Sequence, residues 1–301
     1  MGMVDNLINN VTHEDEVPSR AELTKLSKEE LINKCIEISH YKSLQEDLLL
    51  NISHDLRSPL SVILSVLQCY ESGYLDENNN SKMEQYTRNI KRNSLKMLKL
   101  IDNLIDTTRL ERDYYNIERR NLDVVSLIEN TISSIDRYAK QKNISLIFDT
   151  NIEQCVIAVD AEALDRIIVN LISNAIKFSF ENSNIYVNLW KSSNDLIISV
   201  KDEGIGIPIQ DQSKIFDRFI QCTNKKNSEH CGSGIGLALV EHLTKAHGGS
   251  VELNSIENKG SEFIIKLPII KIKENVEDKK NLLSQKDNVQ MLEIEFSDIY
   301  L

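Results

Sequence analysis

A histidine followed directly by an aspartate is the first candidate for chemistry in this sequence. His54 and Asp55 open the run HDLRSPL, inside a stretch whose apolar residues recur at steps of three and four. His54 stands two positions off that apolar stripe, so its ring is expected to face solvent. An exposed imidazole can act as a nucleophile or exchange protons near neutral pH, although most exposed histidines do neither.

A polar strip on an apolar helix is the second candidate. The helix is predicted over residues 161–178, where Asn170, Asn174 and Lys177 follow one another at steps of four and three and therefore share one face. Such a strip is more often the solvated side of a helix than a binding site. Its interpretation depends on the glycine-rich segments that follow.

Two glycine-rich segments are the third candidate. DEGIGIP at 202–208 follows the apolar run LIISVK, and GSGIGL at 232–237 opens a predicted helix. Glycines at a strand end allow a close approach between backbone and ligand, and glycines before a helix let backbone N–H groups surround a phosphate. Each pattern alone also occurs in ordinary turns.

The elements that position these residues fall into two groups. Apolar residues at helical spacing over residues 52–70 and 90–108, separated by a turn near Gly73, predict a helical hairpin. A hairpin of this size buries little surface alone, so two copies are expected to pair into a four-helix bundle. From about residue 122, predicted helices alternate with short β-rich runs, which indicates a mixed sheet with helices on one face.

The domain organisation follows from these patterns. We expect a disordered tail over residues 1–20, a connecting signalling helix over 21–45 and the helical hairpin over 46–113. The α/β domain should occupy residues 118–271, and residues 272–301 should form a C-terminal tail. The apolar end of that tail, MLEIEFSDIYL, fits a helix or strand docked on the domain and an exposed partner motif equally well.

Five motifs in order resemble the conserved boxes of sensor histidine kinases. HDLRSPL is similar to the H-box, residues 165–179 to the N-box, IFDRF at 215–219 to the F-box, and the two glycine-rich segments to the remaining boxes. The resemblance covers roughly residues 45–270 and includes the closing run AHGGSVELNSIENKGSEFIIKLP. It implies a dimeric helical hairpin followed by an α/β sandwich of the Bergerat type.

The resemblance also implies the chemistry. His54 would be the nucleophile that takes the γ-phosphate of ATP, Asp55 would orient or deprotonate its ring, and Asn174 would give an amide oxygen to Mg²⁺. Asp202 would accept a hydrogen bond from the adenine amino group. The ATP and phosphate site would consist of Asn170, Asn174, Lys177, Asp202, Gly204, Gly206, Phe216, Arg218, Phe219, Gly232, Gly234, Gly236 and Leu237.

The resemblance extends to partners as well. The phosphoryl group would pass from the histidine to an aspartate on a response regulator, and an upstream sensor protein could supply the signal. Residues 221–231 would form a lid over the nucleotide. Ser58 stands where many relatives have Thr or Asn to position a water, so phosphatase activity is not implied.

Composition excludes several other classes. The formal net charge of -11, with basic residues interleaved among acids, argues against a nucleic-acid surface. The five cysteines are scattered without metal or redox spacing, and no run approaches the ~20 apolar residues of a membrane span. We therefore expect a cytoplasmic protein without a membrane span.

Three alternatives share parts of the same pattern. An ATPase of the gyrase, chaperone or mismatch-repair type would have a glutamate one helical turn before the magnesium asparagine, where this chain has Asn170. A degenerate kinase acting as a scaffold would be expected to lack some motif residues, and all are present. An anti-sigma-type serine kinase would normally lack the hairpin with its histidine.

Overall fold

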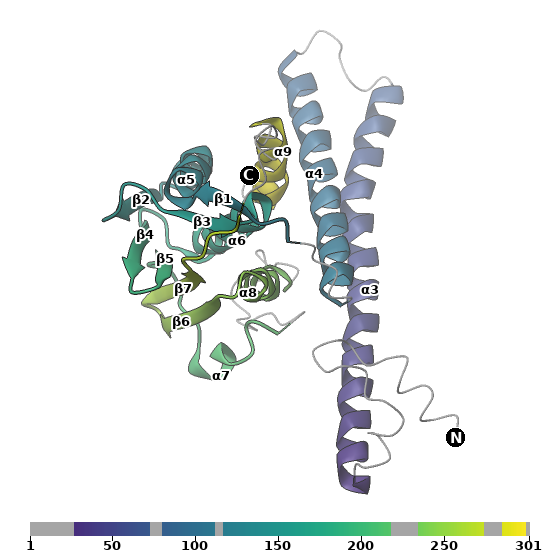
Figure 1. The fold of residues 1–301 in the computed structure, drawn as a ribbon. Coiled ribbons are helices and arrows are strands. Elements are labelled where there is room, and N and C mark those ends of the chain that lie inside the picture. Colours follow the sequence, from purple (N-terminus) through teal and green to yellow (C-terminus); the bar gives the residue numbers. More distant parts are fainter. Residues whose placement is uncertain (1–26, 73–79, 112–116, 218–233, 274–284, 299–301) are drawn as a thin grey trace. The chain divides into compact units, whose positions relative to one another are not determined.

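The chain divides into two compact units. The computed structural model describes residues 27–72, 80–111, 117–217, 234–273 and 285–298 (Figure 1). The first unit is Met1–Tyr114 and the second is Tyr115–Leu301. No helix in these described ranges combines the length and apolarity needed to cross a membrane.

Two long helices make up the described part of the first unit. α3 spans Lys28–Glu71 and α4 spans Asn80–Glu111. α3 begins with a capping box, in which Ser27 accepts a hydrogen bond from the Glu30 backbone and Glu30 accepts one from the Ser27 backbone. From Lys28 onward, the predicted connecting helix and the first hairpin helix are therefore one continuous helix, with Pro59 inside it. The first residues of that prediction (21–26) and the predicted tail over 1–20 lie outside the described residues.

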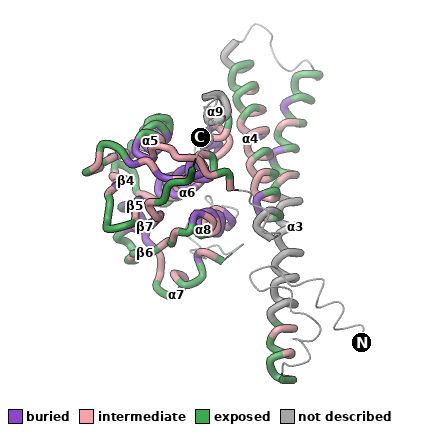
Figure 2. Tube along the Cα trace, viewed as in Figure 1, coloured by how far each residue is buried: buried purple, intermediate pink, exposed green. Residues whose placement is uncertain are grey.

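The hairpin leaves much of its apolar surface uncovered. Val66 is buried between the helices, whereas Leu60 and Leu67 of the predicted stripe are exposed to 43% and 44%. On α4, Ile101 and Ile105 are exposed as well. Figure 2 shows the contrast with the second unit, whose sheet and covering helices contain most of the buried residues.

A five-stranded mixed sheet forms the framework of the second unit. Its order is β2-β4-β5-β7-β6, and β2 runs parallel to β4 while the other neighbours are antiparallel. The strands are β2 (Ser145–Thr150), β4 (Asn184–Ser192), β5 (Asp195–Asp202), β6 (Ser250–Ile256) and β7 (Gly260–Pro268). A separate antiparallel pair consists of β1 (Arg120–Asp123) and β3 (Val156–Val159).

Helices cover one face of this sheet (Figure 1). They are α5 (Val124–Gln141), α6 (Ala161–Phe178) and α8 (Gly236–Ala246), and α7 (Ile209–Gln212) is a single turn after β5. Along β4, inward-facing residues are buried and alternate with half-exposed ones, as expected for a sheet with one covered face. The predicted helical and α/β parts and the mixed sheet are confirmed.

The last described residues form a helix that packs within the second unit. α9 spans Gln285–Glu295 and continues as a single 3-10 turn, Phe296–Asp298. Phe296 is fully buried and stacks on Tyr138 of α5 with ring centroids 4.5 Å apart. Of the two interpretations that the sequence allowed for this segment, the structure has the docked helix.

Candidate functional site

The turn after β5 holds a buried carboxylate. Asp202 is the last residue of β5 and is 6% exposed. Its Oδ1 atom accepts a 2.8 Å hydrogen bond from the Gly204 backbone N–H. Burial raises the pKa of the Asp202 carboxyl above its ordinary value, and hydrogen bonds from the backbones of Gly204 and Ser261 partly oppose this effect. The turn therefore offers an oriented carboxylate at the end of a central strand.

Backbone contacts from distant segments fix this turn against the end of α6. The Ile205 N–H donates to the Phe178 carbonyl at 3.2 Å, and Ser179 forms an isolated bridge with Gly204. A Cβ atom on Gly204 would stand 2.2 Å from the Phe178 carbonyl oxygen, so only glycine allows this approach. Gly206, also predicted from the sequence, is buried two residues further along the same turn.

The polar strip of α6 is present on that helix. Asn170, Asn174 and Lys177 are all half-exposed, in contrast to the buried apolar residues that make up most of the helix. The Asn170 Nδ2 atom donates to the Arg166 carbonyl at 2.8 Å. Among the described residues, no recorded hydrogen bond involves the Asn174 side chain.

The N-terminus of α8 lies beside this strip. A Cβ atom on Gly236, the first residue of α8, would stand 2.6 Å from the Asn170 Oδ1 atom. Gly234 precedes the helix with a φ of 70°, and Leu237 is half-buried on its first turn. α8 has no side-chain cap, so backbone N–H groups at its first turn are available to an anion.

The remaining residues that were predicted to bind the nucleotide divide into two sets. Phe216 is half-buried and packs edge-on against Phe263 of β7 at 6.3 Å. Arg218, Phe219 and Gly232 lie outside the described residues, as does the predicted lid over 221–231. The structure thus brings together α6, the turn after β5 and the start of α8.

The predicted nucleophile lies in the first unit. His54 is a residue of α3, and its side chain is outside the described part of the chain. Asp55, the next residue, and Ser58, one helical turn after His54, are exposed. Further along α3, Ser61 and Ser65 donate to carbonyls four residues before them, at Arg57 and Ser61, each at 2.8 Å.

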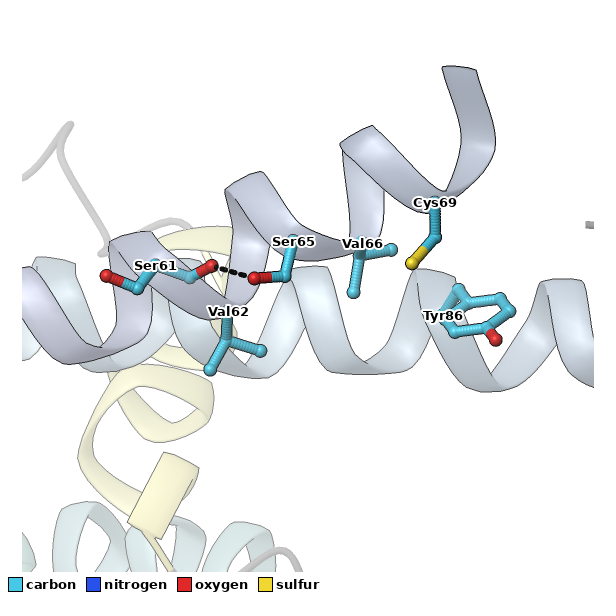
Figure 3. Close-up of a pocket in the computed structure, with 6 residues that line it drawn as sticks. All are labelled: Ser61, Val62, Ser65, Val66, Cys69 and Tyr86. Carbon is cyan, nitrogen blue, oxygen red and sulfur yellow. Dashed lines mark hydrogen bonds between the residues drawn. The ribbon is translucent and has the colours of Figure 1, made fainter. Parts of the chain in front are cut away.

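A shallow groove on the hairpin follows directly after this stretch. Figure 3 shows it between α3 and α4, lined by Ser61, Val62, Ser65, Val66, Cys69 and Tyr86. Among the residues that line the groove, Tyr86 belongs to α4 and the others belong to α3. This apolar groove belongs to the partly uncovered surface of the hairpin.

Sequence reasoning missed a cluster where the N-terminus of α6 meets the C-terminus of α8. His247 caps the end of α8, and its Nε2 atom accepts a 3.1 Å hydrogen bond from the backbone of Asp160, the N-cap of α6. The only available signal for it was the aspartate directly before an apolar helix, which is typical of an N-cap. The histidine partner is 87 residues away and has no local signature.

The chemistry of the donor set suits Mg²⁺ only together with a nucleotide. Within the described part of the chain, no three His, Cys, Asp or Glu residues are grouped so that they could hold a metal ion. The half-exposed Asn174 offers one amide oxygen. A hard cation needs several oxygen ligands, so phosphate oxygens would have to supply the others.

Two family models match the chain. The His Kinase A (phospho-acceptor) domain matches residues 44–113, and the histidine kinase-, DNA gyrase B- and HSP90-like ATPase matches residues 159–271. The matched ranges contain His54 and the α6, β5 and α8 elements described above.

Known proteins resemble most of the chain. It is 27% identical over 259 residues to the circadian input-output histidine kinase CikA of Synechococcus elongatus, covering 84% of this chain and 34% of CikA. It is 30% identical over 283 residues to the sensor histidine kinase TmoS of Ectopseudomonas mendocina, covering 93% of this chain and 28% of TmoS. The chain thus spans about a third or less of these relatives.

A solved structure shares the fold. The histidine kinase ThkA, in complex with the response regulator protein TrrA, aligns with a TM-score of 0.56 at 19% identity. The alignment covers 81% of this chain and 68% of the ThkA chain.

Proposed function

The chain belongs to the histidine kinase family, and from that premise we propose that it transfers the γ-phosphate of ATP to its own His54. The observation that carries the proposal is that one chain holds both a phosphoacceptor-type hairpin and a nucleotide-type cradle of α6, the turn after β5 and the start of α8. We assign the dimerisation and phosphoacceptor role to residues 46–113 and the catalytic role to residues 118–271.

Asp202 is the base-recognition residue in this proposal. Its carboxylate is buried and oriented by the Gly204 backbone, so it can accept a hydrogen bond from an exocyclic amino group. Adenine presents an amino group where guanine presents a carbonyl oxygen. Because an unpaired buried carboxylate is costly, this arrangement favours ATP over GTP.

α6 and α8 receive the phosphates. Lys177 supplies a positive charge, and backbone N–H groups at the start of α8 can donate to phosphate oxygens. Asn174 would hold Mg²⁺ together with phosphate oxygens. When bound, Mg²⁺ neutralises part of the charge that develops on the transferred group.

The transfer step is an in-line displacement on the γ-phosphorus. A ring nitrogen of His54 forms the new N–P bond, the bond to the β,γ-bridging oxygen breaks, and ADP leaves. Asp55 orients the ring or accepts its proton. The phosphoryl group then passes from His54 to an aspartate of a response regulator, a partner class supported by the ThkA complex.

The exposed apolar surface of the hairpin supports a homodimer. Leu60, Leu67, Ile101 and Ile105 lie on a hairpin that cannot cover them alone. Pairing of two hairpins into a four-helix bundle would bury such residues. Analytical ultracentrifugation of the full chain should therefore give a dimer, and a monomer at micromolar concentration would contradict this assignment.

An ATPase without a phosphohistidine is the alternative. Hydrolysis needs a base to activate water, and Asn170 carries an amide whose nitrogen is bound to the Arg166 carbonyl. The proposed site therefore has no carboxylate at that position of α6. Transfer to an internal nucleophile requires none.

Labelling with ATP carrying a radioactive γ-phosphate tests the proposal. We expect a protein-bound label that is labile in acid and stable in alkali, that is lost in His54→Gln and that persists in the matched control His40→Gln, another histidine of α3. Label that persists in His54→Gln would refute the phosphoacceptor assignment. Steady release of phosphate without any protein-bound label would favour the ATPase.

A further inference from the structure

The first described residues of the second unit are tied to the ends of two helices. The Glu118 backbone N–H donates to the Asp160 Oδ2 atom at 2.9 Å, and the Arg119 Nη2 atom donates to the Ala246 carbonyl at 2.6 Å. Asp160 is the N-cap of α6, and Ala246 is the last residue of α8. The chain therefore enters this unit attached to both helices.

His247 joins the same two helix ends to each other. It is 4% exposed, and both ring nitrogens are used: Nε2 accepts from the Asp160 backbone N–H at 3.1 Å, and Nδ1 lies 2.7 Å from the Leu243 carbonyl. These partners require a neutral ring with its proton on Nδ1. Burial lowers the pKa of His247, the nearby Arg119 lowers it further, and the Leu243 carbonyl and Asp160 act in the opposite direction.

The other ends of these two helices form part of the proposed nucleotide site. Gly236 begins α8 beside Asn170 of α6, and His247 follows α8 beside Asp160, which precedes α6. The helices are therefore antiparallel. Asn170 follows Asp160 by ten positions, which corresponds to about 15 Å of helix.

We propose that Arg119, Asp160 and His247 form a linker latch, a set of positioning residues through which the chain entering this unit sets the position of α8 relative to α6. This inference rests on the proposed nucleotide-binding function. The latch holds the two helices at one end, and a nucleotide would hold them at the other. A displacement of the chain before Arg119 would thereby change the site without touching the nucleotide.

The coupling must be reciprocal, which makes it measurable. If an intact latch improves nucleotide affinity, a bound nucleotide must stabilise the latch by the same free energy. The Glu118 amide proton is a direct reporter, because its recorded partner is the Asp160 carboxylate. Nucleotide should therefore slow hydrogen exchange at residues 117–121.

Asp160→Asn is the most selective substitution for cutting the latch. The Asp160 carboxylate accepts from two N–H groups, Glu118 through Oδ2 and Ala163 through Oδ1. An amide side chain has one oxygen and can accept at only one of these positions. Because asparagine is nearly as good an N-cap as aspartate, α6 should keep its cap while the contact with Glu118 is lost.

Asp123→Asn is the matched control. Asp123 is the N-cap of α5 and accepts from the Val125 and Cys155 backbones and from the Ser126 hydroxyl. The substitution makes the same charge change at the same kind of position in the same unit. It touches neither the latch nor the nucleotide site.

Two substitutions at His247 separate its two contacts. In His247→Gln, the side-chain oxygen can reach the place of Nε2 and still accept from the Asp160 backbone. In His247→Asn, the shorter amide can donate to the Leu243 carbonyl but cannot bridge to α6. A purely structural role at the end of α8 predicts that the asparagine is the better substitute, whereas the latch predicts that the glutamine is.

The experiment uses the full chain and the ATP analogue AMPPNP. We expect Asp160→Asn to weaken AMPPNP binding in calorimetry by roughly fivefold or more, the lower end of typical coupling between sites. It should also abolish the nucleotide-dependent slowing of exchange at 117–121. Asp123→Asn should leave both unchanged, and His247→Gln should bind more tightly than His247→Asn.

Unchanged AMPPNP affinity in Asp160→Asn, with slowed exchange retained, would overturn the latch. The result also separates the two proposals. Wild-type protein that binds AMPPNP but is not labelled at His54 would refute the kinase function alone. Labelled His54 together with wild-type behaviour of Asp160→Asn would refute the latch alone, and wild-type protein that fails to bind AMPPNP would refute both.

Discussion

Replacing Phe296 with alanine tests whether the C-terminal helix is an integral part of the second unit. The Phe296 ring is fully buried and stacks on Tyr138, whose own ring is fully buried and whose hydroxyl accepts a 2.7 Å hydrogen bond from Arg137. Truncating a fully buried phenylalanine costs about 3–5 kcal/mol, including the cavity that remains. We therefore expect Phe296→Ala to lower the free energy of unfolding by this amount if α9 stays docked.

A second outcome is a smaller loss of unfolding free energy together with a different dependence on denaturant. If α9 detaches as a unit, the loss cannot exceed the free energy with which it is docked. Detachment would expose surface before global unfolding, and the dependence of the unfolding free energy on denaturant would then become shallower. A loss of 3–5 kcal/mol with an unchanged slope indicates a docked helix with a cavity, whereas a smaller loss with a reduced slope indicates detachment.

Urea denaturation followed by tryptophan fluorescence measures both quantities. Trp190 in β4 is the single tryptophan of the chain, so its signal reports on the second unit. Phe180→Ala is the control, because Phe180 is 50% exposed and its truncation leaves no buried cavity. A Phe296→Ala midpoint and slope equal to those of Phe180→Ala would refute the assignment of α9 to the folded unit.

Three further predictions concern the site and its support. Burial lowers the pKa of His247, so as pH falls the unfolded state binds a proton before the folded state does. The free energy of unfolding should therefore fall as pH drops below about 6.5, by at most about 1.4 kcal/mol per pH unit. His247→Gln should remove this pH dependence, measured by urea titrations between pH 5 and 8. Gly236→Ala should push the Asn170 amide aside and weaken AMPPNP binding about fivefold, or about 1 kcal/mol, while the melting temperature stays near that of wild type; equal affinity would contradict the contact. Asp202→Asn should weaken binding of adenine nucleotides by about tenfold or more in calorimetry, whereas the same change at the exposed Asp149 should not.

Elements with strong local patterns were predictable from the sequence. The helix expected over residues 161–178 is α6 (Ala161–Phe178), because an N-cap aspartate precedes a long apolar run. The short β-rich runs expected after residue 122 are present as strands. β1, the four-residue run RNLD, was missed because its only strand-like property is its pairing with β3.

Residues of the candidate site were predictable where glycine or polar residues interrupt apolar runs. Asp202 and Gly204 follow a buried strand, and Asn170 interrupts an apolar helix. The linker latch left no such trace, because its hydrogen bonds join residues 42, 87 and 127 positions apart. Contacts of that length depend on how the helices pack, which periodicity along one element cannot predict.

The turn after β5 shows why a short glycine motif can encode a precise site. Besides its bond to Phe178, Ile205 accepts a 2.7 Å hydrogen bond from the Asn258 backbone, and the Ile207 N–H donates to the Ser255 hydroxyl at 2.8 Å. Two of these three contacts are between backbone atoms, so they constrain the side chains of their partners little. What the sequence must supply at the turn is the absence of a Cβ atom at the closest approach and one carboxylate at the strand end. The orientation of Asp202 is then a property of the whole sheet and its covering helices, so a side-chain substitution at a distant backbone partner should change nucleotide affinity only if it moves the backbone.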